Sequence, residues 1–260
     1  MALDMQRHLE EFEDQGFTIV PGIAGPEMRK RLISGVEESL QEDARRYLGM
    51  PGKEEFISLD LVQYEGVFWD LMASDIVDEV FSALLNPYWT VYSYTSTVQR
   101  PAGEHYTSKI HNETRRITPP GYNLSALLTL ALDEFTEENG ATYYLPGSHL
   151  THPEKPDEDE FYAKAVRVTR GAGDAVVFHP RVWHAGGQNM TDETRYGCTV
   201  YACLPFMKQR LDFPRMLGWE RAGELSPRLR RILGYDSRVP AGMDQFYVPA
   251  DQRLYLGGQE

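Results

Sequence analysis

The strongest constraint on the fold is a series of short β-rich segments between residues 88 and 206. Residues 88–100 are rich in β-branched and aromatic side chains, and residues 123–135 form an apolar, nearly uncharged run that is typical of a buried central strand. Residues 164–180 read as two strands joined by a glycine-rich turn, and residues 195–206 as a last long strand. Many short strands separated by turns predict a jelly roll or barrel.

Helical patterns lie on either side of this β-rich region. Apolar residues recur at helical spacing within residues 5–12, 25–43 and 74–85, and a further helix is expected over residues 226–234. We therefore expect one domain over residues 1–260, mainly β with a helical layer. Residues 1–88 would form a mostly helical N-terminal layer, residues 89–206 the β core, and residues 207–260 a C-terminal extension.

Charge and cysteine content narrow the classes of partner. The formal net charge is −13, from 26 basic and 39 acidic residues, which argues against nucleic acid or an anionic membrane surface as a partner. No run of 18 apolar residues appears, and the acidic N-terminus is unlike a signal peptide. Cys198 and Cys203 would lie on opposite faces of a strand, so they are expected to stay unpaired, as in a reducing compartment. We expect a cytoplasmic protein, monomeric or homodimeric, that acts on a small molecule.

The segment Ser108–Arg116, SKIHNETRR, holds a histidine and a glutamate two residues apart. In a strand, His111 and Glu113 would point the same way. A further histidine from the segment VVFHPRVWHAGGQN would complete two imidazoles and one carboxylate, a facial triad that suits non-haem Fe(II). His184 is the favoured third ligand and His179 its rival. The alternative is a surface pair of His111 and Glu113 joined by a local hydrogen bond.

Three stretches together resemble one known family. HNE, EENGATYYLPGSH and GDAVVFHPRVWHAGGQNMTDETR resemble phytanoyl-CoA dioxygenase-like enzymes, a branch of the Fe(II)/2-oxoglutarate-dependent oxygenases. Both ends of the chain resemble the usual ends of that family. The resemblance implies a double-stranded β-helix, jelly-roll or cupin-like, with His111, Glu113 and His184 as the metal ligands.

The same resemblance implies roles for residues outside the triad. Arg195 would bind the distal carboxylate of 2-oxoglutarate, while O2 takes the remaining position on iron. Thr129 and Ser93 would add contacts to the co-substrate. The family usually has aspartate where this chain has Glu113, and halogenases of the superfamily have glycine or alanine there, so Glu113 argues against halogenation.

The resemblance implies a dioxygenase that hydroxylates an unactivated C–H bond of a small polar or anionic metabolite, such as an amino acid or a natural-product intermediate. Desaturation, cyclisation and epimerisation use the same centre and stay open. Two alternatives belong to other classes: a non-catalytic cupin-like binding module, and a Zn or Mn hydrolase or isomerase.

Four residues are candidates for substrate contact. If residues 109–115 keep one strand register, Lys109 and Arg115 face inward with the triad, and buried cations there would imply an anion. The alternative is that the strand ends at Glu113 and residues 114–122 form a lid with solvated arginines. Tyr92 and Tyr94 are expected to share one strand face, where they either line the pocket or pack in the core.

Overall fold

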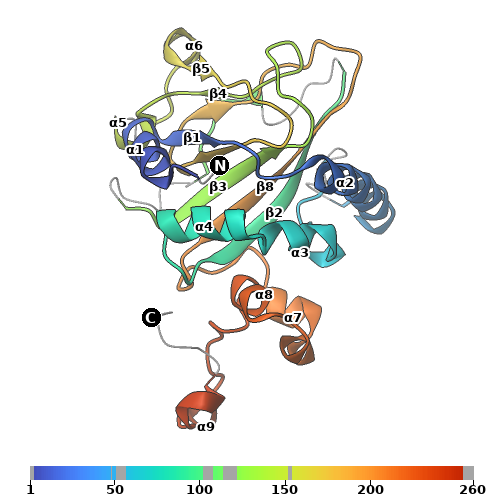
Figure 1. The fold of residues 1–260 in the computed structure, drawn as a ribbon, viewed down its shortest axis with the longest axis vertical. Coiled ribbons are helices and arrows are strands. Elements are labelled where there is room, and N and C mark those ends of the chain that lie inside the picture. Colours follow the sequence, from blue (N-terminus) through green and yellow to red (C-terminus); the bar gives the residue numbers. More distant parts are fainter. Residues whose placement is uncertain are drawn as a thin grey trace.

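The computed structural model of the protein describes residues 3–47, 49–50, 57–101, 108–113, 122–151 and 154–253. Five antiparallel strands form the major sheet (Figure 1). Their spatial order is β1 (Phe17–Val20), β6 (Ala175–Phe178), β3 (Ser125–Ala131), β8 (Arg195–Cys203) and β2 (Thr90–Gln99). The long strands fall where β-branched and apolar residues dominate the sequence.

A smaller sheet lies beside the major one and contributes to the site. Its spatial order is β5 (Val166–Arg167), β4 (Tyr143–Tyr144) and β7 (His184–Ala185). His111 pairs with His184 as an isolated antiparallel bridge along the outer edge of β7. The two antiparallel sheets form the jelly-roll core that the sequence predicts.

Helices from the N-terminal part of the chain cover one face of the major sheet, and in Figure 1 α3 and α4 run across its strands. Helix α2 begins at Pro26, whose fixed φ suits a first helical turn, and it buries Leu32 and Val36. The elements are α1 (Met5–Gln15), α2 (Pro26–Tyr47), the 3-10 turn η1 (Val62–Tyr64), α3 (Val67–Met72) and α4 (Asp75–Leu84).

Shorter helices follow in the β-rich and C-terminal parts. Ser226 caps α8, because its hydroxyl accepts a hydrogen bond from the Leu229 N–H at 3.3 Å. None of the helices in the described ranges is long and apolar enough to cross a bilayer. The elements are α5 (Ser148–Thr151), α6 (Glu158–Lys164), α7 (Phe213–Leu217), η3 (Trp219–Gly223), α8 (Pro227–Ile232), α9 (Met243–Phe246) and η4 (Ala250–Gln252).

Side chains of the major sheet alternate between two different environments. On β8, Cys198 and Val200 join the apolar cluster beneath the helices, whereas Tyr201 packs in a second cluster between the two sheets. Both cysteines are buried and free, as predicted. The helix-covered face of the sheet is thus an apolar core, and the opposite face is left for the site.

One prediction about facing is wrong. Tyr94 is fully buried on the helix side, where its ring meets Phe68 edge-on at 5.6 Å between centroids, while Tyr92 packs on Tyr201 at 4.7 Å on the other side. The pairing of β2 with β8 shifts register between Val91 and Ser93, which breaks the two-residue repeat. Tyr94 is therefore a core residue and lines no pocket beside the triad.

Candidate metal centre

The two histidines of the candidate centre are held together by backbone pairing. The His111 N–H donates to the His184 carbonyl at 3.0 Å, and the His184 N–H donates to the His111 carbonyl at 2.9 Å. Side chains of directly opposed residues share a face, so the two rings lie 4.2 Å apart between centroids. The adjacency of these imidazoles follows from strand pairing between segments more than 70 residues apart in sequence.

Glu113 is brought to the histidines by a contact outside any regular strand. Its N–H donates to the carbonyl of Pro180 at 2.8 Å, which ties it to the turn just before β7. Its Oε1 lies 3.5 Å from His111 Nε2 and 3.9 Å from His184 Nε2. One ligand atom from each of the three residues lies within 4.8 Å of the others, a spacing that could hold one metal ion. His179 is not part of this group, since its Nδ1 accepts a hydrogen bond from the Arg181 N–H.

The hydrogen bonds behind the histidines set their tautomers. His111 Nδ1 lies 2.6 Å from the Lys109 carbonyl, and His184 Nδ1 lies 2.9 Å from the Val182 carbonyl. A carbonyl only accepts, so each Nδ1 must carry the proton, which in the neutral ring leaves a lone pair on Nε2. Both Nε2 atoms face Glu113, and backbone carbonyls fix both rings as metal-binding histidines require. The donor set therefore fits a divalent metal such as Fe(II).

The charges of the three residues are coupled. Burial, and then the neighbouring His111, lower the pKa of His184 to about 4, so this ring is neutral near pH 7. Burial is the largest single effect on His111 and Glu113 and opposes their charged forms. Their mutual hydrogen bond and the neighbouring charges together outweigh it, so the pKa of His111 is raised and that of Glu113 is lowered. In the absence of metal, the carboxylate thus favours a proton on His111 that a metal ion would displace.

A buried guanidinium lies on the same side of the sheet. Arg195, at the start of β8, is 5% exposed, and its Nη1 donates to the Gly140 carbonyl at 2.7 Å. Its guanidinium carbon lies 3.8 Å from the centroid of the Phe135 ring. Burial, and then the positive charge of Arg170, lower the pKa of Arg195 to about 9. In the described part of the chain, its Nε has no hydrogen-bond partner, which leaves a donor for an anion.

The two residues predicted to assist Arg195 lie on the same face of the sheet. Thr129 pairs with Thr199 in the register of β3 and β8, and their hydroxyl oxygens are 2.9 Å apart. Ser93 is buried opposite Tyr201. Thr129 and Ser93 are directly opposed to Thr199 and Tyr201 of β8, so their side chains point to the same face of the sheet as the site.

Two residues of this face were missed by the sequence analysis. The Tyr144 ring stacks on His184 at 5.7 Å and 19°, and burial raises the pKa of its hydroxyl to about 12. Arg170 is buried against Phe135. Tyr144 could have been found from the sequence, because it directly precedes the family-like segment LPGSH. No local signal marked Arg170, because an arginine before a glycine-rich turn reads as solvated.

The cations predicted to flank the triad are placed differently. Of the two alternatives for Lys109, the inward-facing one is wrong. Its side chain is exposed, and only its backbone carbonyl reaches the site, because residues 109–113 form a single bridge instead of a continuous strand. Arg115 lies outside the described residues. An unpredicted cation, Arg210, lies near Tyr92, with 5.7 Å from the guanidinium carbon to the ring centroid, and its charge helps to lower the pKa of Glu113.

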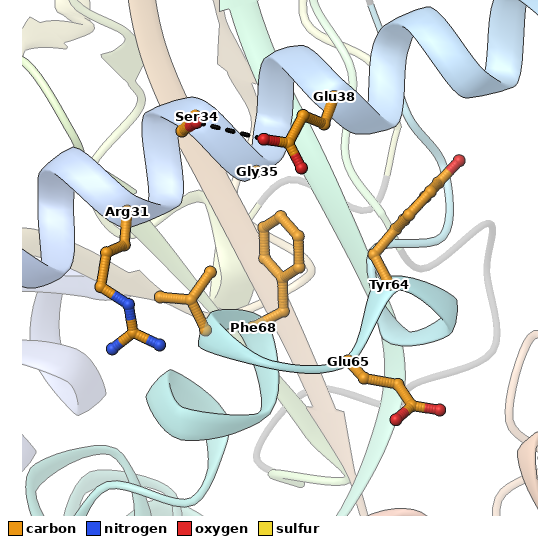
Figure 2. Close-up of a pocket in the computed structure, with 8 residues that line it drawn as sticks. Arg31, Ser34, Gly35, Glu38, Tyr64, Glu65 and Phe68 are labelled. Carbon is orange, nitrogen blue, oxygen red and sulfur yellow. Dashed lines mark hydrogen bonds between the residues drawn. The ribbon is translucent and has the colours of Figure 1, made fainter.

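A separate pocket of about 350 Å³ lies on the helical side of the molecule. Figure 2 shows it between α2 and the segment from η1 to α3, with Phe68 pointing toward Gly35 of the helix. Its charged residues are largely engaged, since Arg31 pairs with Asp70 at 2.8 Å. None of the three candidate metal ligands lines it.

Comparisons with known proteins give a family. A model of the phytanoyl-CoA dioxygenase (PhyH) family matches residues 12–197. The "Uncharacterized protein Rv1501" of Mycobacterium tuberculosis is 36% identical over 154 residues, which make up 59% of this chain and only 56% of that protein. The chain thus spans about half the length of this mycobacterial relative. "Dioxygenase trt7" of Aspergillus terreus is 28% identical over 261 residues, covering 93% of this chain and 88% of that protein.

Solved structures share the fold. AviO1 from Streptomyces viridochromogenes superposes with a TM-score of 0.62 at 21% identity, covering 80% of this chain and 98% of that one. SnoK, a non-heme alpha ketoglutarate dependent carbocyclase from nogalamycin biosynthesis, gives 0.59 at 20% identity, covering 76% and 83%. These likenesses agree with the jelly-roll arrangement of the two sheets. Because the family model covers well over half of the sequence, the chain belongs to the phytanoyl-CoA dioxygenase family.

Proposed function

We propose that this protein is an Fe(II)- and 2-oxoglutarate-dependent dioxygenase. The observation that carries the proposal is the convergence of His111, Glu113 and His184, with both Nε2 atoms turned toward the carboxylate and both Nδ1 atoms held by backbone carbonyls. Membership of the family and the dioxygenase names of its fungal relatives support the same activity.

Each residue has a defined task in this proposal. His111, Glu113 and His184 bind Fe(II) on one side and leave the other side open. Arg195 binds the distal carboxylate of 2-oxoglutarate, since its planar guanidinium is charged and has a free donor in a buried site. Thr129 and Ser93 would add contacts to the co-substrate from the same face of the sheet. When bound, Fe(II) with 2-oxoglutarate and O2 supplies an oxidant for unactivated C–H bonds.

Hydroxylation of a small polar or anionic metabolite, an amino acid or a natural-product intermediate, is the outcome we favour. Arg210 supports an anionic substrate, because it is exposed, close to Tyr92, and near enough to influence Glu113. Its N–H donates to the Tyr92 carbonyl at 2.9 Å, which fixes its backbone beside β2. Cyclisation is the second candidate, because the fold is shared with a carbocyclase.

The setting of the enzyme is also part of the proposal. The net charge of −13 favours a small-molecule substrate over nucleic acid or an anionic membrane surface. Two buried, free cysteines favour the cytoplasm. A monomer or a homodimer would serve this chemistry equally well, because all three proposed ligands come from one chain.

The proposal is tested by adding Fe(II) and then 2-oxoglutarate to metal-free protein without oxygen. A visible metal-to-ligand charge-transfer band should form in the wild type and be absent from the His184→Ala variant. Succinate release on admission of O2 should then report turnover during substrate screening. Normal binding of Fe(II) or Zn(II) without any band would reject the dioxygenase and favour a hydrolase, an isomerase or a binding module.

A further inference from the structure

Arg170 is a buried cation that the proposed function does not yet use. It follows β5, and its backbone pairs with Phe135 through hydrogen bonds of 3.0 and 2.9 Å, so its position is fixed by the fold. The residue is 5% exposed, and its Nη1 makes only a long contact of 3.4 Å to the Val168 carbonyl. Within the described residues, neither its Nε nor its Nη2 has a hydrogen-bond partner.

Arg170 and Arg195 lie against the same aromatic ring. Their guanidinium carbons are 4.0 and 3.8 Å from the centroid of Phe135. No ion pair is made by either guanidinium within the part of the chain that the structure describes. Two buried cations at one aromatic ring without an anion are costly, because each loses its water and the charge of Arg170 disfavours that of Arg195. The arrangement is therefore incomplete without a bound anion.

Tyr144 connects this pair to the candidate metal centre. Its ring stacks on His184. Burial raises the pKa of its hydroxyl, and the positive charges of Arg170 and Arg195 act in the opposite direction. Tyr144 thus contacts a metal ligand through its ring and lies within the electrostatic influence of both guanidiniums. The distal carboxylate of a 2-oxo diacid would supply the anion that these cations lack.

We propose that Arg170 and Arg195 together bind the distal carboxylate of the 2-oxo acid co-substrate, so that this pocket selects a dicarboxylate with two guanidiniums. The inference rests on the proposed function. The nitrogens without partners are Nε and Nη2 of Arg170 and Nε of Arg195, and a carboxylate offers about four acceptor positions for them. The phenyl ring of Phe135 contacts both planar guanidiniums and restricts their rotation.

The test compares two co-substrates that differ only at the distal end. Metal-free protein is loaded with Fe(II) without oxygen and titrated with 2-oxoglutarate or with 2-oxopentanoate, which keeps the chelating end but lacks the second carboxylate. The charge-transfer band gives a Kd for each. Arg170→Met should raise the Kd of 2-oxoglutarate about tenfold or more, the worth of a charge-assisted hydrogen bond. The Kd of 2-oxopentanoate should stay unchanged.

Two further variants separate binding from structure. Arg29→Met is the matched control, because Arg29 on α2 also donates to a backbone carbonyl, that of Leu132 at 3.0 Å, and should leave both Kd values unchanged. Arg170→Lys keeps the positive charge but lacks the planar fork of the guanidinium. Its Kd for 2-oxoglutarate should lie between those of the wild type and Arg170→Met. The melting temperature of metal-free Arg170→Met should equal or exceed that of the wild type, since an uncompensated buried cation is removed.

The outcomes are distinct. A wild-type band that forms with 2-oxoglutarate and keeps its Kd in Arg170→Met overturns the inference and leaves the proposed function intact. Equal weakening of both co-substrates, together with a lower melting temperature, overturns it in favour of a structural role. A wild type that forms no band with 2-oxoglutarate refutes the proposed function and this inference with it.

Discussion

The two faces of the major sheet come from the same strands and have opposite characters. On β8, Cys198 and Val200 point into the apolar cluster beneath the helices, while Thr199 and Tyr201 point toward the second sheet. The helix-covered face gains its stability from tightly buried hydrocarbon. The site-facing side holds hydroxyls, imidazoles and guanidiniums that cost stability when buried, so their retention there marks a function.

The largest expected effect is on the site-facing side, at the carboxylate of the triad. Glu113→Ala should lower Fe(II) affinity and turnover about 100-fold or more, because even the groups behind metal ligands are worth 10–100-fold. Fe(II) titration measures the affinity, and succinate release measures the turnover. Glu113→Asp should keep most of the affinity and most of the turnover, because aspartate is the usual residue at this position in the family. Unchanged Fe(II) affinity in Glu113→Ala would remove this residue from the ligand set.

The largest effect on stability is expected on the opposite side. Leu128 of β3 is fully buried in the apolar cluster beneath the helices. Leu128→Ala should reduce the free energy of unfolding by about 2–5 kcal/mol in urea denaturation and leave the Kd of 2-oxoglutarate unchanged at temperatures where the variant is folded. A Kd that weakened in step with stability would mean that the two faces are coupled.

The strands of the major sheet and the residues of the site were predictable from the sequence to different degrees. Strand β8 was predictable because its side chains alternate between two buried surfaces, and the long apolar run around β3 marked a central strand. The triad was predictable from residue types and the family resemblance, although its geometry depends on a bridge to His184 and a hydrogen bond to Pro180 that no local pattern shows.

The failures also have physical causes. Tyr92 and Tyr94 were expected to share one face because side chains of a strand repeat every two residues, and the register shift after Val91 places them on opposite faces. Lys109 would have faced inward only in a continuous strand, which does not form. Arg170 was missed because its burial comes from Phe135, which is distant in sequence. Propensity and periodicity report local structure and not such long-range contacts.

The stability of the fold is expected to depend on pH through His179, a buried histidine near the N-terminal helix α1. His179 follows β6 and packs on Phe12 of α1 with 5.9 Å between ring centroids, and burial lowers its pKa to about 4. His179 takes up a proton near pH 6.5 in the unfolded chain and only near pH 4 in the folded chain. The stability that the neutral ring contributes is therefore fully present above pH 6.5 and is lost as the pH falls from 6.5 to 4.

The size of this effect is measurable with one variant. At pH 5, the shifted pKa of His179 should lower the free energy of unfolding by about 2 kcal/mol relative to its value well above pH 6.5. The free energy of unfolding of metal-free protein should therefore fall more between pH 7.5 and pH 5 in the wild type than in His179→Gln. Identical pH dependence in the two proteins would mean that His179 is solvated or already charged in the fold.

The smallest expected effect concerns the hydroxyl pair of the site-facing side. Thr199→Val leaves the Thr129 hydroxyl without its partner at 2.9 Å. The loss of one buried hydrogen bond should cost about 1 kcal/mol in the free energy of unfolding. If Thr129 contacts the co-substrate, the KM for 2-oxoglutarate should also change; Val200→Ala on the opposite face should lower stability without changing that KM.

The most direct test of the central claim is the number of Fe(II) ions bound per chain, measured by anaerobic equilibrium dialysis. The wild type should bind one Fe(II), His184→Ala should bind none at the same free concentration, and His179→Ala should bind one, because His179 is a nearby buried histidine outside the triad. Retention of Fe(II) by His184→Ala together with its loss from His179→Ala would contradict the account and move the metal site elsewhere.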